Sequence, residues 1–446
     1  MMPTTTNEGA ARGWMMYDFA SQPFHTLIIT FIFAPYFASA VASDPVTGQA
    51  VWGYAVGAAG LAIALVAPFL GAVADAAGPR KPWMMVFAVF YVLGAAGLWF
   101  AVPGMENTLP VLIALVIGII GVEFSTTFNN AMLPDIAAPD DIGRVSGSGW
   151  GFGYIGGLLA LALVLAFLAE DETGVTFLGL APAFGLDAGM REGTRSVGPL
   201  TALWFIVFMI PFFLMVPDVK RRPSAKNAVR TGIAELIKTL KSLPSRQSLF
   251  YYLISSMFYR DALVGLFAFG GIYAAGVLGL SVVQVGVFGI IAAATGAVGA
   301  WTGGRADNRY GPRPILFVSI IILIFVCVIV VMTSREAVLG MAIPPDSTLP
   351  VTVFYITGGI IGACAGSLQA ASRTMVVRLS DPDRMTEAFG LYALSGKATA
   401  FVAPLSIGVV TELSGSQQIG ITPIVILFLI GLVLLMMMRR NETGIA

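Results

Sequence analysis

Long apolar runs joined by short polar loops are the feature that most restricts how this chain can fold. A helix that crosses a membrane needs about 20 mostly apolar residues, and twelve stretches of the sequence meet that requirement. Charged residues make up only 11% of the 446 residues, well below the roughly 25% of an average soluble domain. We therefore predict an all-α membrane protein with transmembrane helices at roughly 15–41, 51–73, 83–102, 109–133, 146–169, 199–216, 250–278, 281–303, 314–333, 350–375, 387–411 and 419–438.

One long polar stretch, 217–248, separates the first six runs from the last six. It predicts an N-terminal six-helix half at 1–216, a linker at 217–248 and a C-terminal six-helix half at 249–446. Apolar residues recur in the linker at helical spacing among basic residues: Val229, Ile233, Leu236, Ile237 and Leu240. This pattern favours an amphipathic helix on an anionic inner leaflet; the alternative is a solvated linker.

The basic residues indicate how the chain is oriented. With the N-terminus inside, nineteen of the 25 Lys and Arg residues fall in cytoplasmic segments and three in outer loops. Cytoplasmic loops carry the excess of positive charge, so we expect both termini in the cytoplasm. The first apolar run lacks a small-residue cleavage pattern, and we expect a retained span and not a signal peptide.

Three sequence features recur between the halves, which predicts pseudo-symmetry. Asp18 corresponds to Asp261, 243 residues later, and Pro139-Asp140 corresponds to Pro382-Asp383 with the same offset. After the second run of each half stand Gly71-x-x-Ala74-Asp75-x-x-Gly78-Pro79-Arg80 and Gly303-x-x-Ala306-Asp307-x-x-x-Gly311-Pro312-Arg313. In each loop the aspartate can accept helix N-terminal N–H groups and pair with the cation. We predict a conformational latch of Asp75, Arg80, Asp307 and Arg313; alternatively, the aspartates only end their helices.

The repeated loop resembles the loop signature of the major facilitator superfamily, whose fold consists of two six-helix repeats. Four further motifs resemble the family of autophagy-linked vacuolar amino-acid effluxers: Trp14-x-x-Tyr17-Asp18-Phe19-Ala20, Asn130-Ala131-x-Leu133-Pro134 with Val145-Ser146-Gly147, Gly153-Tyr154-x-Gly156-Gly157, and Gln369-Ala370-x-Ser372-Arg373 with Phe389-Gly390-Leu391-Tyr392-x-Leu394-Ser395-Gly396-Lys397. The resemblance covers most of both halves. It implies a secondary transporter and suggests amino-acid efflux across a bacterial inner membrane.

Charged residues within apolar runs are costly and mark candidate functional sites. Three acidic residues, Asp18, Glu123 and Asp261, are balanced by three basic ones, Arg260, Arg373 and Lys397. Helical spacing adds polar neighbours on the same faces: Gln22 and His25 beside Asp18, Thr127 and Asn130 beside Glu123, and Gln369 beside Arg373. The resemblance implies that these faces, on the first, fourth, seventh and tenth helices, line a central cavity.

We assign the polar residues to two predicted groups. The substrate-binding group is Lys397, Glu123, Tyr154, Gln369, Asn130 and Gln22, in which cations would hold an anionic group and a carboxylate would hold a cationic group or a proton. The coupling or gate group is Asp261, Asp18, Arg373, His25 and Arg260; we expect Arg260 to pair locally or to reach the headgroups. The alternative for both groups is a set of structural ion pairs that fix helix packing.

These observations predict a transporter and not an enzyme. We expect a small polar or zwitterionic solute, moved by alternating access with a proton or another coupling ion, and a monomer surrounded by lipid. The net charge of zero implies no nucleic-acid partner, and we expect no cofactor and no metal, since one histidine and two separated cysteines make a poor ligand set. The alternatives are a lipid or amphiphile as cargo and, remotely, an intramembrane aspartyl protease, whose expected Gly-x-Gly-Asp motif is missing.

Overall fold

The computed structural model of the protein describes residues 3–43, 45–171, 173–219, 227–280, 282–344 and 346–438. Within these ranges twelve helical stretches are long and apolar enough to cross a membrane. This confirms the predicted all-α membrane fold. A short hairpin of β1 (Ala337–Val338) and β2 (Met341–Ala342) lies in the loop before the tenth span.

The first six spans form what we call the N-terminal set. They comprise α1 (Glu8–Pro23) with η1 (Phe24–Phe31), α2 (Phe33–Tyr36) and η2 (Phe37–Val41), then α3 (Pro45–Ala77), α4 (Lys81–Gly97) with η3 (Leu98–Phe100), α5 (Leu109–Ala131) with α6 (Leu133–Ile136), η4 (Pro139–Asp141) with α7 (Ile142–Phe167), and α8 (Glu192–Arg195) with α9 (Val197–Met215). A short turn, η5 (Ala183–Gly185), lies in the loop after α7.

The last six spans form the C-terminal set. They comprise α11 (Gln247–Gly276), α12 (Val282–Tyr310), α13 (Pro312–Val331), α14 (Leu349–Leu379), η8 (Pro382–Arg384) with α15 (Met385–Ala398) and α16 (Val402–Ser414), and α17 (Gln417–Gly420) with α18 (Thr422–Met436). Several helices extend beyond the predicted apolar runs, so that Asp75 and Asp307 lie within the last turns of α3 and α12.

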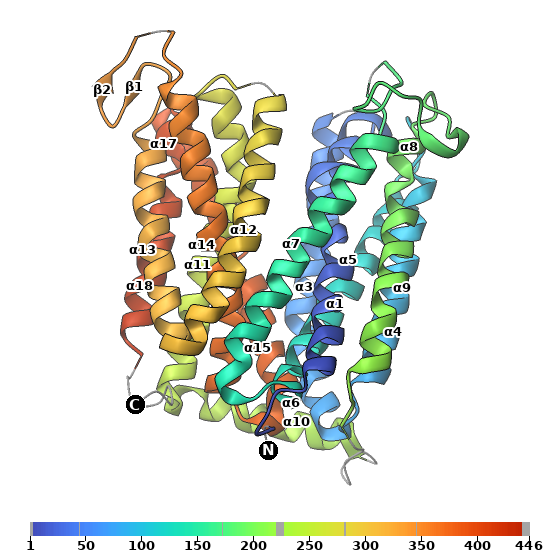
Figure 1. Cartoon of the computed structure of the whole chain (residues 1–446), viewed down its shortest axis with the longest axis vertical. Coiled ribbons are helices and arrows are strands. Elements are labelled where there is room, and N and C mark those ends of the chain that lie inside the picture. The colour runs from blue at the N-terminus through green and yellow to red at the C-terminus, as the bar shows by residue number, and fades with distance from the viewer. Residues whose placement is uncertain are drawn as a thin grey trace.

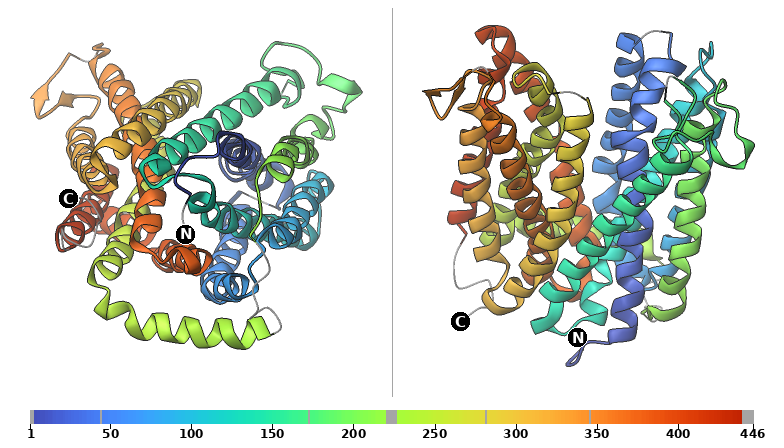
Figure 2. Two further views of the ribbon diagram at one scale, coloured as in Figure 1. Left: turned by 60° about the horizontal axis from the view of Figure 1, so that its bottom comes forward. Right: turned by 45° about the horizontal axis from the view of Figure 1, so that its top comes forward.

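The two sets lie side by side, blue to green and yellow to red in Figure 1. We call the face at the bottom of Figure 1, where the two ends of the chain lie, the terminal face, and the other the opposite face. The sequence predicts that the terminal face is cytoplasmic. Toward this face α3 packs along α15 and α7 packs along α12, whereas the sets draw apart at the opposite face (Figure 2, right).

Glycines bring the backbones of the two sets together near the terminal face. A Cβ on Gly71 of α3 would lie 2.5 Å from the carbonyl oxygen of Thr386 at the start of α15. A Cβ on Gly304 of α12 would lie 2.7 Å from the Cα of Gly147 on α7. Small residues let membrane helices approach closely, so these glycines explain how tightly the two sets close at this face.

Among the described residues, the first and the eleventh spans contain irregular helical segments. The first span changes to π-helix at Phe24, in η1, and again at Phe37, in η2; such segments are rare and occur frequently at functional sites. The eleventh span breaks between α15 and α16, where residues 399–401 form a turn. Irregular backbone at membrane depth is tolerated where it is buried in protein or lines a cavity, which directs attention to this region.

The linker between the sets contains the helix that its spacing predicts, α10 (Ala228–Ser242), followed by η7 (Leu243–Ser245). It runs along the terminal face from the N-terminal set toward the C-terminal set (Figure 2, left). Part of the predicted pattern, Lys226, lies outside the described residues.

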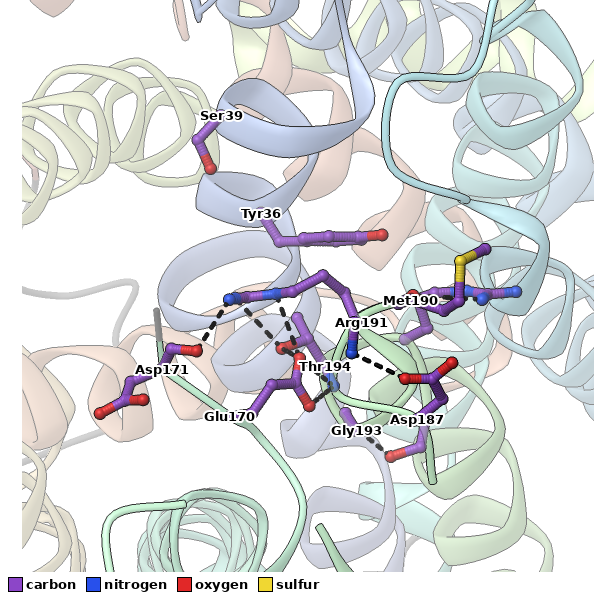
Figure 3. Close-up of polar contacts among 12 residues, drawn as sticks. Tyr36, Ser39, Glu170, Asp171, Asp187, Met190, Arg191, Gly193 and Thr194 are labelled. Carbon is purple, nitrogen blue, oxygen red and sulfur yellow. Dashed lines mark hydrogen bonds and ion pairs between the residues drawn. The ribbon is translucent and has the colours of Figure 1, made fainter. Parts of the chain in front are cut away.

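The long loop between α7 and α9 is anchored to the first span at the opposite face (Figure 3). The buried Glu170 carboxylate accepts a hydrogen bond from the Thr194 hydroxyl at 2.7 Å and lies 3.1 Å from Nε of Arg191. The Arg191 guanidinium in turn lies 5.9 Å from the centre of the Tyr36 ring in α2. The loop thus ties the end of the first span to the start of the sixth.

Candidate functional site

An ion pair joins the two sets inside the membrane. Glu123 projects from α5 and Lys397 from the last turn of α15, and Lys397 Nζ lies 2.7 Å from Glu123 Oε1. Lys397 is twelve residues beyond Met385, about 18 Å along α15 at 1.5 Å per residue. The two side chains remain 27% and 23% exposed. Because the sets close together on the terminal side, we infer that this exposure is toward the opposite face.

The other residues of the predicted substrate-binding group lie on α1, α5, α7 and α14. The Tyr154 hydroxyl of α7 accepts a hydrogen bond from Gln369 Nε2 of α14 at 3.2 Å, which is a second polar contact between the sets. Asn130 lies two turns beyond Glu123 on α5, and its buried Oδ1 has no hydrogen-bond partner among the described residues. Gln22 of α1 packs against α7. The predicted group thus comprises charged, hydroxyl and amide side chains on both sets.

A second ion pair lies closer to the terminal face and is almost fully buried. Arg373 of α14 donates two hydrogen bonds to the Asp18 carboxylate of α1, at 2.9 and 3.1 Å. The guanidinium also lies 4.8 Å from the centre of the Trp14 ring and 5.3 Å from that of Trp150. Only 4% of the Arg373 side chain and 10% of the Asp18 side chain are exposed. This pair closes the space between the sets on the terminal side of Glu123 and Lys397. His25, which the sequence assigns to the same coupling or gate group, is half-buried in η1.

Arg260 and Asp261 both face the broken eleventh span, on different sides of the break. Arg260 donates a hydrogen bond to the Tyr392 carbonyl at 2.8 Å and lies 4.1 Å from the centre of the Tyr392 ring, so its partner is on another helix, α15. The buried Asp261 accepts a hydrogen bond through Oδ2 from the backbone N–H of Ala403, at 2.9 Å. Asp261 therefore caps the start of α16 from another helix, as an acidic group at a helix N-terminus does. Its Oδ1 has no hydrogen-bond partner in the described part of the chain.

The first predicted latch residue, Asp75, binds across the two sets. Its carboxylate accepts hydrogen bonds from the backbone N–H groups of Thr386 and Glu387 at the start of α15, at 3.2 and 2.8 Å. Arg80 lies 3.3 Å from Asp75 and also forms an ion pair with Asp135. The motif therefore holds a helix of the other half, a partner that the sequence does not specify.

The corresponding contact of the second repeat uses the residue after the predicted aspartate. Asn308 Oδ1 accepts a hydrogen bond from the backbone N–H of Arg144 at the start of α7, at 2.8 Å, and its amide donates to Asp141 at 3.3 Å. Asp307 is fully buried behind this contact and lies 4.0 Å from Arg378. The second contact is thus built on an amide where the first is built on a carboxylate.

Arg313 is placed away from the start of α7. Its guanidinium donates a hydrogen bond to the Met438 carbonyl at 2.9 Å, just beyond the end of α18. Sequence reasoning missed this position and the partners Asn308, Arg378 and Thr386. The repeat contained a usable signal, because Thr386 and Glu387 stand 243 residues after Gly143 and Arg144, so the two contacts at the terminal face involve corresponding positions of the two halves.

Solved transporter structures share this architecture. The chain aligns with FucP, a major facilitator superfamily transporter solved in the outward conformation, with a TM-score of 0.70 at 11% identity, covering 97% of this chain and 98% of that one. It aligns with the human organic anion transporter MFSD10 with a TM-score of 0.69 at 15% identity, covering 96% and 99% of the two chains. These likenesses establish the major facilitator fold.

Relatives in sequence are also transporters or autophagy proteins. YxiO of Bacillus subtilis, an uncharacterized MFS-type transporter, is 26% identical over 430 residues, 95% of this chain and 93% of the relative. Autophagy-related protein 22 of Cryptococcus neoformans is 22% identical over 288 residues, 62% of this chain and 47% of the relative. The chain therefore spans about half the length of that fungal relative.

The family model described as "Vacuole effluxer Atg22 like" matches residues 43–444 of the chain. Together with the fold, this match identifies a transporter and not an enzyme, which removes the protease alternative. The chain belongs to the Atg22-like vacuole effluxer family of major facilitator superfamily secondary transporters.

Proposed function

We propose that this transporter carries a zwitterionic, amino-acid-like solute that binds between Glu123 and Lys397. The observation that supports the proposal is the partly exposed ion pair, 2.7 Å long, with one partner from each set. An α-amino acid carries its ammonium and carboxylate on a single carbon atom, so it can present both charges to such a pair at once.

The exchange of partners has a favourable energy balance. A buried ion pair contributes little net stability, because desolvation offsets most of its Coulomb attraction. The solute carboxylate would take the place of Glu123 beside Lys397, and the solute ammonium would take the place of Lys397 beside Glu123. Binding would then loosen a contact between the sets while satisfying both charges, which is what alternating access about a central site requires.

We propose a proton as the coupling ion and Asp261 as the group that carries it. Asp261 is buried, accepts one hydrogen bond, and has one carboxylate oxygen without a described partner. Acidic residues inside membrane spans commonly serve as proton relays in transporters. We further propose that the solute is exported across a bacterial inner membrane, which the Bacillus relative and the effluxer description of the family support.

Solute exchange in proteoliposomes tests the proposal. Purified protein is reconstituted, the vesicles are loaded with unlabelled amino acids, and uptake of a mixture of radiolabelled amino acids is measured against competitors. We expect competition by zwitterions and much weaker competition by N-acetylated amino acids and by amino-acid amides, which lack one of the two charges. Equal competition by the singly charged analogues, or no exchange at all, would refute the zwitterion site.

The same assay separates the proposal from a lipid or amphiphile as cargo. A lysophospholipid below its critical micelle concentration is added as a further competitor. We expect it to leave exchange unchanged, because the proposed site is polar and lies between the sets. Absence of amino-acid exchange, together with protein-dependent transfer of a labelled lysophospholipid in the same vesicles, would favour the amphiphile.

A further inference from the structure

Helix α10 exposes an apolar stripe that the rest of the protein does not cover. Val229, Ile233, Ile237 and Leu240 are each at least 40% exposed. At about 100° per residue they fall within an arc of about 80°. Exposed apolar side chains aligned in this way on a surface helix indicate a membrane or partner interface.

Basic residues border one edge of the stripe. Arg230, Lys238 and Lys241 are exposed and lie beyond Ile237 around the helix, on the side away from the protein. The buried residues Gly232 and Thr239 lie about 110° from the centre of the stripe. The apolar, the basic and the protein-facing sides of α10 are therefore three distinct surfaces. The helix lies along the edge of the terminal face (Figure 2, left).

We propose that α10 is a binding surface for an anionic membrane leaflet, and that lipid bound there favours the conformation closed at the terminal face. The charge of the helix selects this occupant, since apolar side chains bordered by cations match the acyl-chain boundary and the anionic headgroups. The proposal concerns the conformational equilibrium and does not depend on which solute is carried.

On its protein-facing side, α10 contacts both sets. Gly232 packs against α3, where an added Cβ would lie 2.7 Å from the backbone nitrogen of Val73. Toward the C-terminal set, Arg384 donates a hydrogen bond to the Glu235 carbonyl at 2.6 Å and lies 3.4 Å from the Glu235 carboxylate. The helix therefore bridges the sets close to the contact of Asp75 with α15.

The two contacts differ in how closely they are packed. The contact with α3 brings backbone against backbone. On the other side α10 meets the C-terminal set through side chains around a small, partly open pocket of about 20 Å³, which is lined by Thr239, Arg246, Leu253, Ser380, Asp381 and Arg384 among others. We infer that α10 moves with the N-terminal set, so that the contact with Arg384 breaks when the sets separate at this face.

Membrane binding and bridging support each other. The stripe and the protein-facing side are different surfaces, so α10 can use both at once. A leaflet that holds the helix in one orientation reduces the conformational freedom that it loses on bridging, which makes the two events cooperative. Lipid shifts the equilibrium only through such a difference in affinity for the two conformations.

Distance measurements in lipid nanodiscs test the proposal. Spin labels are placed on the full chain at the opposite face with Glu106→Cys and Asp346→Cys, one on each set, after the buried Cys327 and Cys364 have been replaced by Ala. The ratio of the long to the short distance reports the conformation that is closed at the terminal face. It is measured in nanodiscs of phosphatidylcholine alone and with one third phosphatidylglycerol.

The test variant is Arg230→Gln with Lys241→Gln, and the matched control is Arg305→Gln with Arg309→Gln, which removes two exposed cations elsewhere on the same face. We expect phosphatidylglycerol to raise the distance ratio about five-fold or more in the unsubstituted and control proteins. This change corresponds to the free energy with which one basic residue binds near an anionic membrane surface. The test variant should lose this response. Gly232→Leu should lose it as well, because it detaches α10 from α3 and leaves the stripe and its cations unchanged.

Three outcomes would overturn the proposal. One is an equal ratio in both lipid compositions for the unsubstituted protein, and another is a lipid response that survives both the test variant and Gly232→Leu. The third is a dimer in detergent, if Ile233→Gln with Ile237→Gln dissociates it and leaves the lipid response unchanged. The stripe would then belong to a contact between two copies of the chain.

Discussion

Arg373 is held inside the membrane by a carboxylate and two aromatic rings. Asp18 forms two hydrogen bonds with the guanidinium, and Trp14 and Trp150 cover it. Planar, doubly hydrogen-bonded pairing and stacking on aromatic rings are specific to arginine. Gly149 on α7 completes the site, because a Cβ there would lie 2.6 Å from Asp18 Oδ2. The pair therefore depends on a position without a side chain.

Gly149→Ala should weaken this pair. The added methyl group would contact the carboxylate and the Trp14 ring, at a cost of about 1–3 kcal/mol in the stability of the terminally closed conformation. Gly151→Ala on the same helix is the control, because the nearest atom to its Cβ would be 3.3 Å away. The temperature of thermal unfolding and the distance between spin labels at positions 106 and 346 should change far more in Gly149→Ala than in Gly151→Ala. Equal effects would mean that the pair tolerates the methyl group.

Asp261→Asn should separate transport from proton coupling. Asparagine can still accept the hydrogen bond of Ala403, but it cannot carry a proton. Loss of the charge at the start of α16 costs about 0.3–1 kcal/mol, so exchange without a pH gradient should fall less than about ten-fold. Accumulation driven by an imposed pH gradient should be abolished. Full gradient-driven accumulation by the variant would assign the coupling proton to another group.

The sequence predicted which polar residues lie in the membrane, because charge in an apolar run is conspicuous. It could not predict their partners. The 243-residue offset relates Arg373 to Asn130 and Lys397 to Tyr154 as corresponding positions, whereas the structure places Arg373 against Asp18 and Lys397 against Glu123. Contacts between the halves depend on how two helix bundles dock, and spacing within one helix carries no such information.

The packing of α3 on α15 closes the terminal face. Besides the hydrogen bonds of Asp75, the backbones meet at Gly71, against the Thr386 carbonyl, and at Gly390, where an added Cβ would lie 2.5 Å from the Ala67 carbonyl. Neither contact leaves room for a side chain. The two helices therefore pack backbone against backbone in a single arrangement, and this packing must be lost when the sets separate.

Gly71→Ala should shift the protein away from the terminally closed conformation. Its methyl group would meet the Thr386 backbone, which cannot move aside as a flexible side chain can. Gly57→Ala on the same helix is the control, because a Cβ there has no heavy atom within 4 Å. Overpacking of this kind costs about 1–3 kcal/mol, so the distance ratio of the labels at positions 106 and 346 should fall about five-fold or more. An unchanged ratio in Gly71→Ala would show that α3 and α15 do not control closure.

At the level of helices, apolar run length predicted the spans well but not their irregularities. The break after Lys397 falls at residues 399–401, just before Pro404 in the first turn of α16, and a proline disrupts a helix at the carbonyl four residues earlier. The π-helical segment that begins at Phe24 follows directly on Pro23 at the end of α1. Proline thus marks both places in the sequence, whereas the cap that Asp261 supplies to α16 is a tertiary contact that the sequence does not reveal.

The whole molecule is closed at one face by two related contacts and is held together at its centre by an ion pair. Each repeat uses the end of its second helix to bind the start of a helix in the other half, through Asp75 to α15 and through Asn308 to α7. The sequence predicted the repeat, but only the docked halves show that the two contacts cross between them. Lys397 lies in the last turn of α15, whose first turn Asp75 binds, and the sets are apart at the opposite face (Figure 1).

The charge arrangement around the central pair gives it a polarity. Arg260 lies against Gly396, next to Lys397, so the C-terminal side of the site is cationic, while Glu123 makes the N-terminal side anionic. A zwitterionic solute would therefore bind in one direction, with its carboxylate toward the C-terminal set.

Exchange of the two charges, with Glu123→Lys and Lys397→Glu in one protein, tests the central claim most directly. The exchanged pair can still join the sets, so thermal stability should stay close to that of the unsubstituted protein. Solute exchange in proteoliposomes should fall about thirty-fold or more, the equivalent of about 2 kcal/mol for charges placed against the wrong partners. Exchange at the unsubstituted rate would contradict the account, because the pair would then be a structural contact and not the site of the solute.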